Sequence, residues 1–159
     1  ASEYVHAIFG VNKGEVPPLD LQFEKNLQDA LLDLIKFKMV KSAHDVSDGG
    51  LAVALGECCI SNREQQLGAE IKIDEILRPD SLLFGETQSR IIISCAARDA
   101  QEIESFFARR DVPCAMIGTV GGPALKINGL VNTSLKKMSD AFYNAMPQFM
   151  GEGQPVAQA

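Results

Sequence analysis

The sequence predicts a layered α+β domain, in which helices pack on strands. Residues 67–74, LGAEIKID, alternate between apolar and polar side chains, which is typical of a strand with one buried face. Residues 90–96, RIIISCA, are almost uniformly apolar, which favours a strand covered on both faces. Segments with helical periodicity alternate with these strands. Since the chain has 159 residues, 46% of them hydrophobic, it is long enough for about one domain with its own core.

The first part of the chain predicts two helices separated by a connector. Residues 3–9 form a short helix, and the Pro pair and glycines of residues 10–20, GVNKGEVPPLD, interrupt regular structure. Asp20 is placed to cap a second helix that runs to about Lys38. The buried stripe of this helix consists of four apolar residues at helical spacing, namely Leu27, Leu31, Leu34 and Ile35.

A strand, a tight turn and a helix follow in direct succession. The strand covers about residues 42–46, the turn is 47–50, and the helix LAVALGECCI runs to about Ile60. The strand at 67–74 comes next, and its buried face consists of Leu67, Ala69, Ile71 and Ile73. Strand, turn and helix in this order place the polar residues of the turn at one end of a buried element.

The last part of the chain predicts two helices and a hairpin. The strand at 90–96 precedes an amphipathic helix that buries Ile103, Phe106 and Phe107. Residues 112–120 and 124–131 are expected to form two strands joined in a hairpin by Gly121-Gly122-Pro123. Ser134 can cap a final helix, whose buried residues are Leu135, Met138, Phe142 and Met146. In terms of domains, we expect an opening helix and connector at 1–19, the folded domain at 20–150 and a flexible tail at 151–159.

Composition and charge exclude several classes of partner. The formal net charge of -6 disfavours a broad grip on nucleic-acid phosphates, so no DNA or RNA partner is expected. No apolar run approaches the roughly 18 residues of a membrane span, and the first residues lack the pattern of a signal peptide. We therefore expect a soluble protein. The four cysteines form no CxxC pair, so we expect free thiols, a cytoplasmic location and no metal site.

The turn after the strand at 42–46 is the first candidate site. It reads Ala43-His44-Asp45-Val46-Ser47-Asp48-Gly49-Gly50-Leu51 and ends where a helix begins. The two glycines permit close backbone approach, and the unpaired N–H groups of the new helix favour an anion. Two carboxylates would repel a bare phosphate, so they suit a hydrogen bond to a hydroxyl or amine, or a phosphate bridged by Mg²⁺. The structural alternative is that Ser47 or Asp48 merely caps the helix.

A second polar cluster, Leu83-Phe84-Gly85-Glu86-Thr87-Gln88-Ser89-Arg90, precedes the strand at 90–96. It predicts a loop that contacts a ligand or another domain, and the alternative is a Glu86–Arg90 ion pair that anchors the loop. Residues 118–122, GTVGG, lack the Lys of a phosphate-binding loop. His44 is a further candidate loop contact, although neighbours on a strand point to opposite faces, so no His44–Asp45 pair is implied. No catalytic residue is predicted, since the two histidines lie beside no recognisable nucleophile.

The segment SAHDVSDGGLAVALGECC closely resembles the signature of the carboxy-terminal domain of the phosphoribosylformylglycinamidine synthase family. Further segments match in the same order: SEYVHAIFG, PPLDL, LLFGETQSR and VPCAMIGTV. Aminoimidazole ribonucleotide synthase, thiamine-monophosphate kinase, selenophosphate synthase and hydrogenase-maturation proteins share the domain type. The resemblance implies a three-layer α/β/α arrangement with a mixed sheet, partly ferredoxin-like.

The resemblance also implies a part in a larger enzyme. That enzyme converts formylglycinamide ribonucleotide, ATP and glutamine-derived ammonia to the amidine, ADP and phosphate, with ATP and Mg²⁺ held mainly by parts that this chain lacks. The implied partners are the amino-terminal domains, a glutaminase subunit or domain, and the small-molecule substrate. The isolated chain should be inactive and should bind no cofactor, while Asp45, Ser47, Asp48, Gly49 and Gly50 face the cleft. Two alternatives remain: a non-catalytic assembly module, and a domain of a small-molecule kinase of the thiamine-monophosphate kinase type.

Overall fold

A computed structural model describes residues 2–151 of the chain. Its helices are α1 (Glu3–Phe9), α2 (Leu21–Lys36), α3 (Gly50–Ile60), α4 (Pro79–Phe84), α5 (Ala100–Ala108), α6 (Leu135–Tyr143) and α7 (Ala145–Phe149), and a short 3₁₀ turn lies at Ala97–Asp99. Its strands are β1 (Val40–Asp45), β2 (Ala69–Ile71), β3 (Ile91–Cys95), β4 (Gly118–Val120), β5 (Ala124–Ile127) and β6 (Val131–Ser134). No helix in this range is long and apolar enough to cross a membrane.

The strands fall into two sheets. β1 pairs antiparallel with β3, and the order in the other sheet is β4-β2-β5-β6. Within the second sheet β2 runs parallel to β5 and antiparallel to β4, so this sheet is mixed. The predicted mixture of helices with a mixed sheet is confirmed.

The predicted hairpin at Gly121-Gly122-Pro123 is wrong, because β2 lies between β4 and β5. The chain instead passes over the end of β2, where Gly68 N–H donates to the carbonyl of Gly122 at 2.9 Å. The hairpin of this sheet joins β5 to β6 through residues 128–130, in which Asn128 and Gly129 have positive φ (49° and 70°). An Asn-Gly pair is a strong hairpin signal, and this pair was not among the predicted turns. Of the strand expected at 112–120, only β4 is regular.

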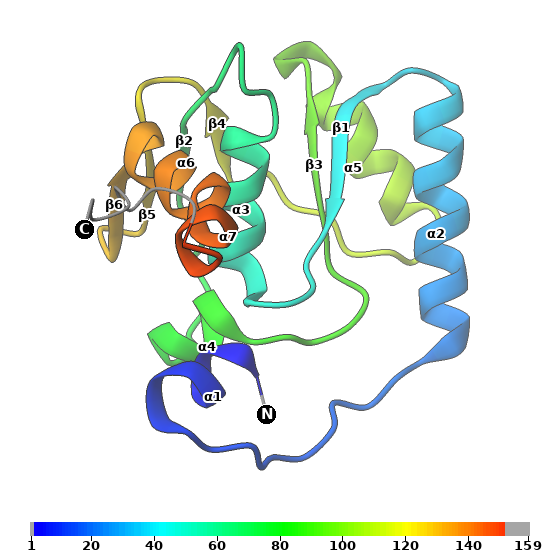
Figure 1. Cartoon of the computed structure of the whole chain (residues 1–159). Helices are drawn as coiled ribbons and strands as arrows, with labels where there is room; N and C mark the ends of the chain where they lie inside the picture. Colours follow the sequence, from blue (N-terminus) through cyan, green and yellow to red (C-terminus); the bar gives the residue numbers. More distant parts are fainter. Residues whose placement is uncertain (1, 152–159) are drawn as a thin grey trace, which may run out of the picture.

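Two clusters of buried side chains form the core. In the first, α3 packs on the four-stranded sheet through residues that include Leu55, Ile60, Ile71, Leu125 and Ile127. In the second, α2 and α5 pack together and cover one face of β1 and β3 (Figure 1). Because side chains alternate along a strand, β3 serves both clusters: Ile91, Ile93 and Cys95 contact the second, and Ile92 contacts the first. All five β3 residues are half-buried, so this strand is less covered than predicted.

Asp20 caps α2 as predicted, because its Oδ1 accepts hydrogen bonds from the N–H groups of Gln22 and Phe23, both at 3.0 Å. The predicted buried stripe is confirmed at Leu27 and Leu34, but Leu31 is only partly buried. Ile35 is 45% exposed, whereas Ala30 is fully buried between α2 and its neighbours. A small residue on this face lets α2 approach α5 closely within the second cluster, and the large Ile35 is turned toward solvent.

The carboxy-terminal helices α6 and α7 bury fewer side chains than predicted. Ser134 caps α6 by accepting from Lys137 N–H at 3.3 Å, as predicted. Phe142 and Met146 are nevertheless exposed, and Leu135 and Met138 are only partly buried against the first cluster. Tyr143 connects α6 to α3, because its hydroxyl donates to the carbonyl of Ile60 at the end of α3 (2.9 Å). The sequence did not indicate this contact. Of the strand predicted at 67–74, only β2 is regular. Ala69 and Ile71 are buried as predicted, whereas Ile73 is partly buried and Leu67 is exposed.

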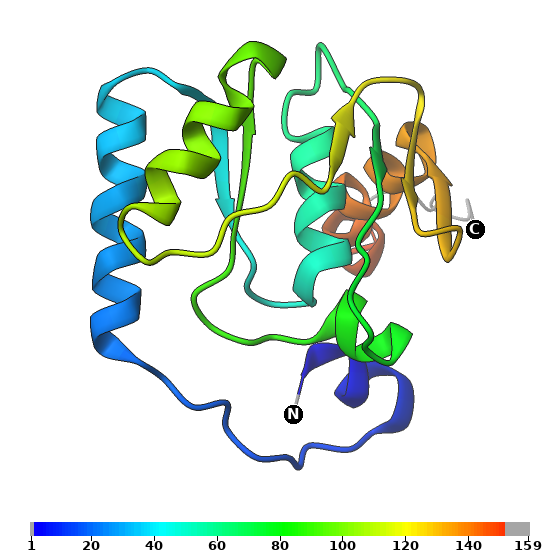
Figure 2. The same ribbon diagram turned by 180° about the vertical axis from the view of Figure 1, so that it is seen from behind.

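The chain begins beside α4 and then crosses the molecule. α1 packs on α4 by a stacked pair of rings, Tyr4 and Phe84, with centroids 4.5 Å apart. The connector then runs along one end of the molecule to the start of α2 (Figures 1 and 2). The flexible tail predicted at 151–159 lies outside the described residues apart from Gly151, and the boundary between residues 19 and 20 remains a prediction.

Candidate functional site

The Asp45–Gly50 loop connects β1 to α3 and starts where the pairing of β1 with β3 ends. Asp45 lies opposite Ile91, and Val46 N–H donates to the carbonyl of Arg90 at 2.9 Å. Val46 is buried, whereas the next two residues, Ser47 and Asp48, are exposed. Neither of these two side chains makes a hydrogen bond within residues 2–151. The loop therefore presents a hydroxyl and a carboxylate that the fold leaves free.

The structural alternative, a helix capped by Ser47 or Asp48, is wrong. The N-cap residue of α3 is Gly49, in the left-handed region at φ 80°, and no side chain of the loop caps the helix. The acceptor comes from a distant segment, because Glu86 Oε1 accepts from Gly49 N–H at 2.8 Å. A carboxylate at the amino terminus of a helix is favoured by the helix dipole. One of the N–H groups that we expected to be available to an anion is therefore already bonded to Glu86.

The two glycines are required by packing within the chain. A Cβ on Gly50, whose φ is 71°, would lie 2.7 Å from the backbone of Phe84 and 2.9 Å from the carbonyl oxygen of Gly85. A Cβ on Gly49 would lie 2.6 Å from a methyl group of Val53. Close backbone approach was predicted at this turn, and the group approached is the segment that begins at Phe84.

The second polar cluster, residues 83–90, lies against this loop. The predicted Glu86–Arg90 ion pair is absent from the described residues. Glu86 accepts instead from two backbone N–H groups, those of Gly49 and Glu3 (2.9 Å), and Arg90 donates to the carbonyl of Gly85 at 3.3 Å. The two candidate segments therefore form one structural unit, the loop unit. It is joined by the backbone hydrogen bond from Val46 to Arg90, by Glu86 and by the contact of Gly50 with Phe84.

Ser89 and Glu24 belong to this unit and were missed by the sequence analysis. Ser89 has φ 61°, which is unusual for a residue other than glycine, and its hydroxyl donates to a carboxylate oxygen of Glu24 on α2. That hydrogen bond, followed by one from Gln28, lowers the pKa of Glu24 below its ordinary value. No local pattern indicates such a pair, since the two residues are 65 positions apart.

His44 contacts α3 as well as its own strand. Its Nε2 lies 3.4 Å from Glu57 Oε2, and its Nδ1 lies 2.6 Å from the carbonyl oxygen of Asp45. The Asp45 carboxylate is 4.0 Å from the same nitrogen and points largely into solvent. Glu57 is thus the closer carboxylate partner. The sequence does not reveal it, because it lies in the second turn of the following helix.

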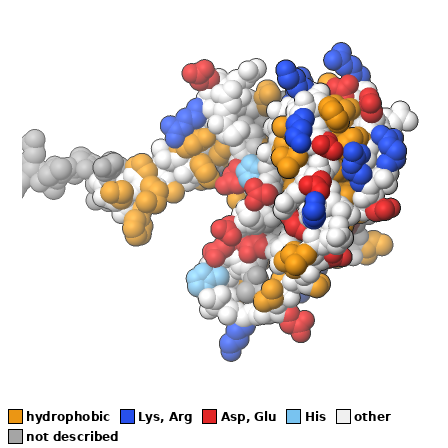
Figure 3. Space-filling model, turned by 90° about the vertical axis from the view of Figure 1, so that its right-hand side faces the viewer, with side chains coloured by type: hydrophobic (Ala, Val, Ile, Leu, Met, Phe, Trp, Pro, Cys, Tyr) orange, Lys and Arg blue, Asp and Glu red, His pale blue; other side chains and the backbone are white. Residues whose placement is uncertain are grey.

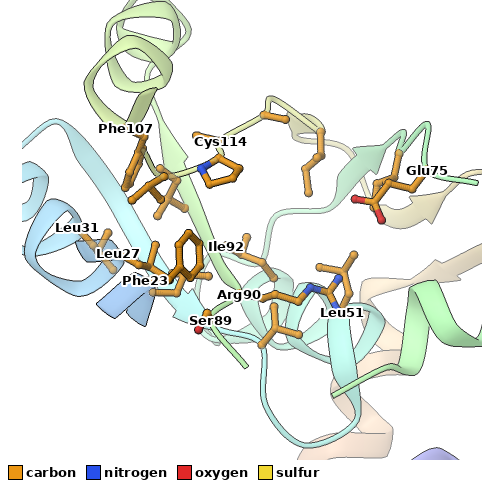
Figure 4. Close-up of a pocket in the computed structure, with 18 of the residues that line it drawn as sticks. Phe23, Leu27, Leu31, Leu51, Glu75, Ser89, Arg90, Ile92, Phe107 and Cys114 are labelled. Carbon is orange, nitrogen blue, oxygen red and sulfur yellow. The ribbon is translucent and has the colours of Figure 1, made fainter. Parts of the chain in front are cut away.

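A cavity of about 500 Å³ lies next to the unit, between β3 and the segment that leads to β4 (Figure 4). Its walls are mainly apolar, with polar groups at the margin, and Arg90 is the one predicted site residue among those that line it. Arg90, Ser89 and Leu51 lie together at one end of this cavity, and Glu75 lies apart from them. Ser47 and Asp48 do not line it.

The charge around the loop is predominantly negative. Figure 3 shows acidic side chains gathered in and beside a hollow on the side of the molecule that carries α2. Asp45, Asp48, Glu57 and Glu86 all lie within the loop unit or in contact with it. No group of three or more His, Cys, Asp or Glu side chains in residues 2–151 is arranged to hold a metal ion. The described residues therefore do not fit an ATP–Mg²⁺ site by themselves, and a phosphate here would need cations from elsewhere.

The mixed sheet, the helices that cover it and the polar loop unit define a layered α+β domain that presents an exposed hydroxyl and carboxylate at one edge. Residues 1–127 match the family described as "AIR synthase related protein, C-terminal domain". Because the match covers most of the chain, the chain belongs to this family.

Curated relatives are longer proteins. The phosphoribosylformylglycinamidine synthase subunit PurL of Alkaliphilus metalliredigens is 36% identical over 153 residues, which cover 94% of this chain and 20% of the relative. The subunit of the same name from Moorella thermoacetica is 38% identical over 153 residues, with the same coverage. The chain thus spans about one fifth of the length of these relatives.

Solved structures share the fold. Phosphoribosylformylglycinamidine synthase II from Thermotoga maritima superimposes with a TM-score of 0.67 at 20% identity, over 77% of this chain and 22% of that protein. T. maritima PurL complexed with FGAR gives a TM-score of 0.62 at 19% identity, over 73% of this chain and 21% of that one. At these identities the likeness concerns the fold.

Proposed function

We propose that this chain serves as the carboxy-terminal domain of a phosphoribosylformylglycinamidine synthase, in its synthetase subunit. The observation that carries the proposal is the identity of 36% and 38% to two subunits of that name across 94% of the chain. The whole enzyme would convert formylglycinamide ribonucleotide, ATP and ammonia from glutamine to the amidine, ADP and phosphate. This makes the protein a cytoplasmic ATP-dependent carbon–nitrogen ligase of purine biosynthesis.

The part played by this chain is to complete a cleft. ATP and Mg²⁺ would be held by other domains, because the described residues supply neither a metal cluster nor a phosphate-binding loop. The T. maritima PurL structures include one complexed with FGAR and one complexed with ATP, so the fold occurs in a protein that binds both. Amino-terminal domains of the same enzyme and a glutaminase are the proposed macromolecular partners, and a structure of PurLQS from T. maritima shares the fold.

The Asp45–Gly50 loop is the proposed contact with the substrate. Ser47 can donate or accept a hydrogen bond, and the Asp48 carboxylate can accept one from a ribose hydroxyl or from an amide N–H. Because both side chains are exposed and make no hydrogen bond within the described part of the chain, binding breaks no existing contact. The negative surroundings favour the neutral hydroxyl and amide parts of the nucleotide over its phosphate.

The test uses the longer protein that contains this chain. Formation of the amidine and release of ADP should require formylglycinamide ribonucleotide, and thiamine monophosphate should not replace it. The substitutions Ser47→Ala and Asp48→Asn should raise KM for the nucleotide about tenfold each, since a hydrogen bond to a charged or polar partner contributes about 1 to 2 kcal/mol. Asp45→Asn should reduce kcat/KM less.

Glu64→Gln is the matched control, because Glu64 is an exposed carboxylate in the loop between α3 and β2. It should behave like the unmodified protein. Turnover that is independent of formylglycinamide ribonucleotide would contradict the proposed reaction. Unchanged kinetics in all three loop variants would leave the loop a structural junction and favour the alternative of an assembly module.

A further inference from the structure

A single carboxylate oxygen joins three segments of the chain that are far apart in sequence. Glu86 Oε1 accepts from Gly49 N–H at 2.8 Å and from Glu3 N–H at 2.9 Å. The first donor is the N-cap residue of α3, and the second is the first residue of α1. Glu86 itself follows α4 by two positions. The side chain therefore holds the far end of the Asp45–Gly50 loop in place.

The near end of the loop is fixed independently. Val46 N–H donates to the carbonyl of Arg90, and β1 pairs with β3 up to Asp45 opposite Ile91. Between the two fixed ends, Gly50 N–H donates to the carbonyl of Ser47 at 3.0 Å, which closes the turn. The exposed side chains of Ser47 and Asp48 lie between these ends, so their position depends on both.

The contact at the far end depends on Glu86. Gly49 and Gly50 are in the left-handed region and have no side chains with which to hold the turn. No side chain of the loop caps α3, so the N-cap N–H has Glu86 as its acceptor. The negative charge of this carboxylate lies at the amino termini of two helices, where the helix dipoles stabilise it.

We infer that Glu86 is a positioning residue, which sets the place of Ser47 and Asp48 for the nucleotide through the Gly49 N–H. This inference rests on the proposed function of the loop. Glu86 does not itself touch the substrate. Glu86 must supply an acceptor oxygen within reach of the Gly49 and Glu3 N–H groups. Both a carboxylate and a carboxamide provide such an oxygen.

The experiment compares Glu86→Gln and Glu86→Ala in the full-length protein, with Glu64→Gln and Glu64→Ala as controls. Glu86→Ala should lower kcat/KM for the nucleotide about tenfold or more, mainly through KM, because it removes a charge-assisted hydrogen bond. Glu86→Gln should stay within about threefold of the unmodified protein, because its amide oxygen can accept from the same two N–H groups. The Glu64 variants should match the unmodified protein.

Hydrogen exchange supplies a second measurement that does not depend on turnover. The amides of Gly49 and Glu3 should lose protection together in Glu86→Ala and keep it in Glu86→Gln. If Glu86→Ala does not fold, Glu86→Asp replaces it. Its shorter side chain cannot reach both donors, so at least one amide should lose protection and KM should rise.

Three outcomes overturn the inference and leave the proposed function standing. Unchanged exchange at Gly49 in Glu86→Ala would show that the hydrogen bond does not hold the loop. Suppose that Glu86→Ala exposes the Gly49 amide but has normal kinetics, while Ser47→Ala in a separate protein impairs the kinetics. That result would show a purely structural role for Glu86. Equal loss of activity in Glu86→Gln and Glu86→Ala, with Gly49 still protected in the Gln variant, would place the carboxylate on the substrate. Normal kinetics in Ser47→Ala and Asp48→Asn would instead defeat the proposed function together with the inference.

Discussion

Gly50 and Phe84 approach each other so closely that a methyl group on Gly50 would lie 2.7 Å from the backbone of Phe84. This contact presses the first turn of α3 against the end of α4. Substitution Gly50→Ala should therefore combine two penalties, a left-handed backbone at φ 71° and a clash with atoms that cannot rotate away. We expect a loss of about 3 kcal/mol in the free energy of unfolding, measured by urea denaturation.

Gly129→Ala separates the two penalties. Gly129 has nearly the same φ, 70°, but a Cβ there would meet no atom within 4 Å. It should cost only the backbone term, about 1 kcal/mol. Equal losses at the two positions would contradict the idea that Gly50 is required by its contact with Phe84.

Ser89 should show an unusual order of substitution effects. Its φ of 61° favours glycine, and its hydroxyl bond to Glu24 compensates for the strained backbone. Ser89→Ala removes the bond and keeps the strain, whereas Ser89→Gly removes both. We expect Ser89→Gly to be more stable than Ser89→Ala by about 1 kcal/mol in denaturant unfolding, the reverse of the order in a helix. The usual order would show that the backbone at Ser89 is not strained.

Cys59 should resist modification at neutral pH. Burial, followed by the neighbouring Cys58, raises the pKa of the Cys59 thiol to about 11, because a thiolate is poorly solvated there. Reaction with a disulfide reagent should be slow at pH 8 and should accelerate as pH rises toward 11, while urea-unfolded chain reacts fast at both. All four thiols, which are free in the structure, should be alkylated after unfolding without reductant. Fewer than four adducts would indicate a disulfide.

The raised pKa of Cys59 should also make the stability of the chain depend on pH. The unfolded thiol ionises near its ordinary pKa of 9.0, before the folded one does. The stabilising contribution is therefore fully present below pH 9 and is lost as pH rises from about 9 to about 11. The unfolding free energy of the unmodified chain should fall over this window more than that of Cys59→Ala. Parallel pH profiles for the two proteins would count against the raised pKa.

The isolated chain should have no catalytic activity. It lacks a metal cluster and a phosphate-binding loop in residues 2–151, and it spans about one fifth of the relatives that it matches. We expect no ATP hydrolysis and no amidine formation with ammonia, measured by ADP release. Restored turnover on addition of the remaining domains would support the proposed role, and turnover by the chain alone would contradict it.

The sequence was sufficient for features that depend on local chemistry. The cap at Asp20, the cap at Ser134 and the buried face of α5 follow from residue type and spacing, and the structure confirms them. The order of strands does not follow in this way. Residues 118–122 have the composition of a hairpin, but the insertion of β2 beside β4 is decided by long-range pairing.

The candidate site shows the same division. The turn with Gly49 and Gly50 was predicted from its residues, and the strand and helix on either side of it are confirmed. The acceptor for its helix is Glu86, which is 37 positions away, and the partner of His44 is Glu57. A capping acceptor supplied by a distant segment leaves no spacing that can be recognised, so local chemistry favoured Ser47 or Asp48 instead.

The division of the strands between two sheets has a consequence for how the molecule opens. Within residues 2–151, β1 and β3 pair only with each other, so no ladder of hydrogen bonds connects α2, α5 and this strand pair to the rest. The two halves are held by side-chain packing across β3 and by the loop unit around Glu86. We therefore expect opening in two cooperative steps, in which the amides of the α2–β1–β3–α5 half exchange as one unit, separately from those of α3 and the larger sheet. If the proposed role of the Asp45–Gly50 loop holds, a nucleotide bound there would couple the two steps, because this loop joins the two halves.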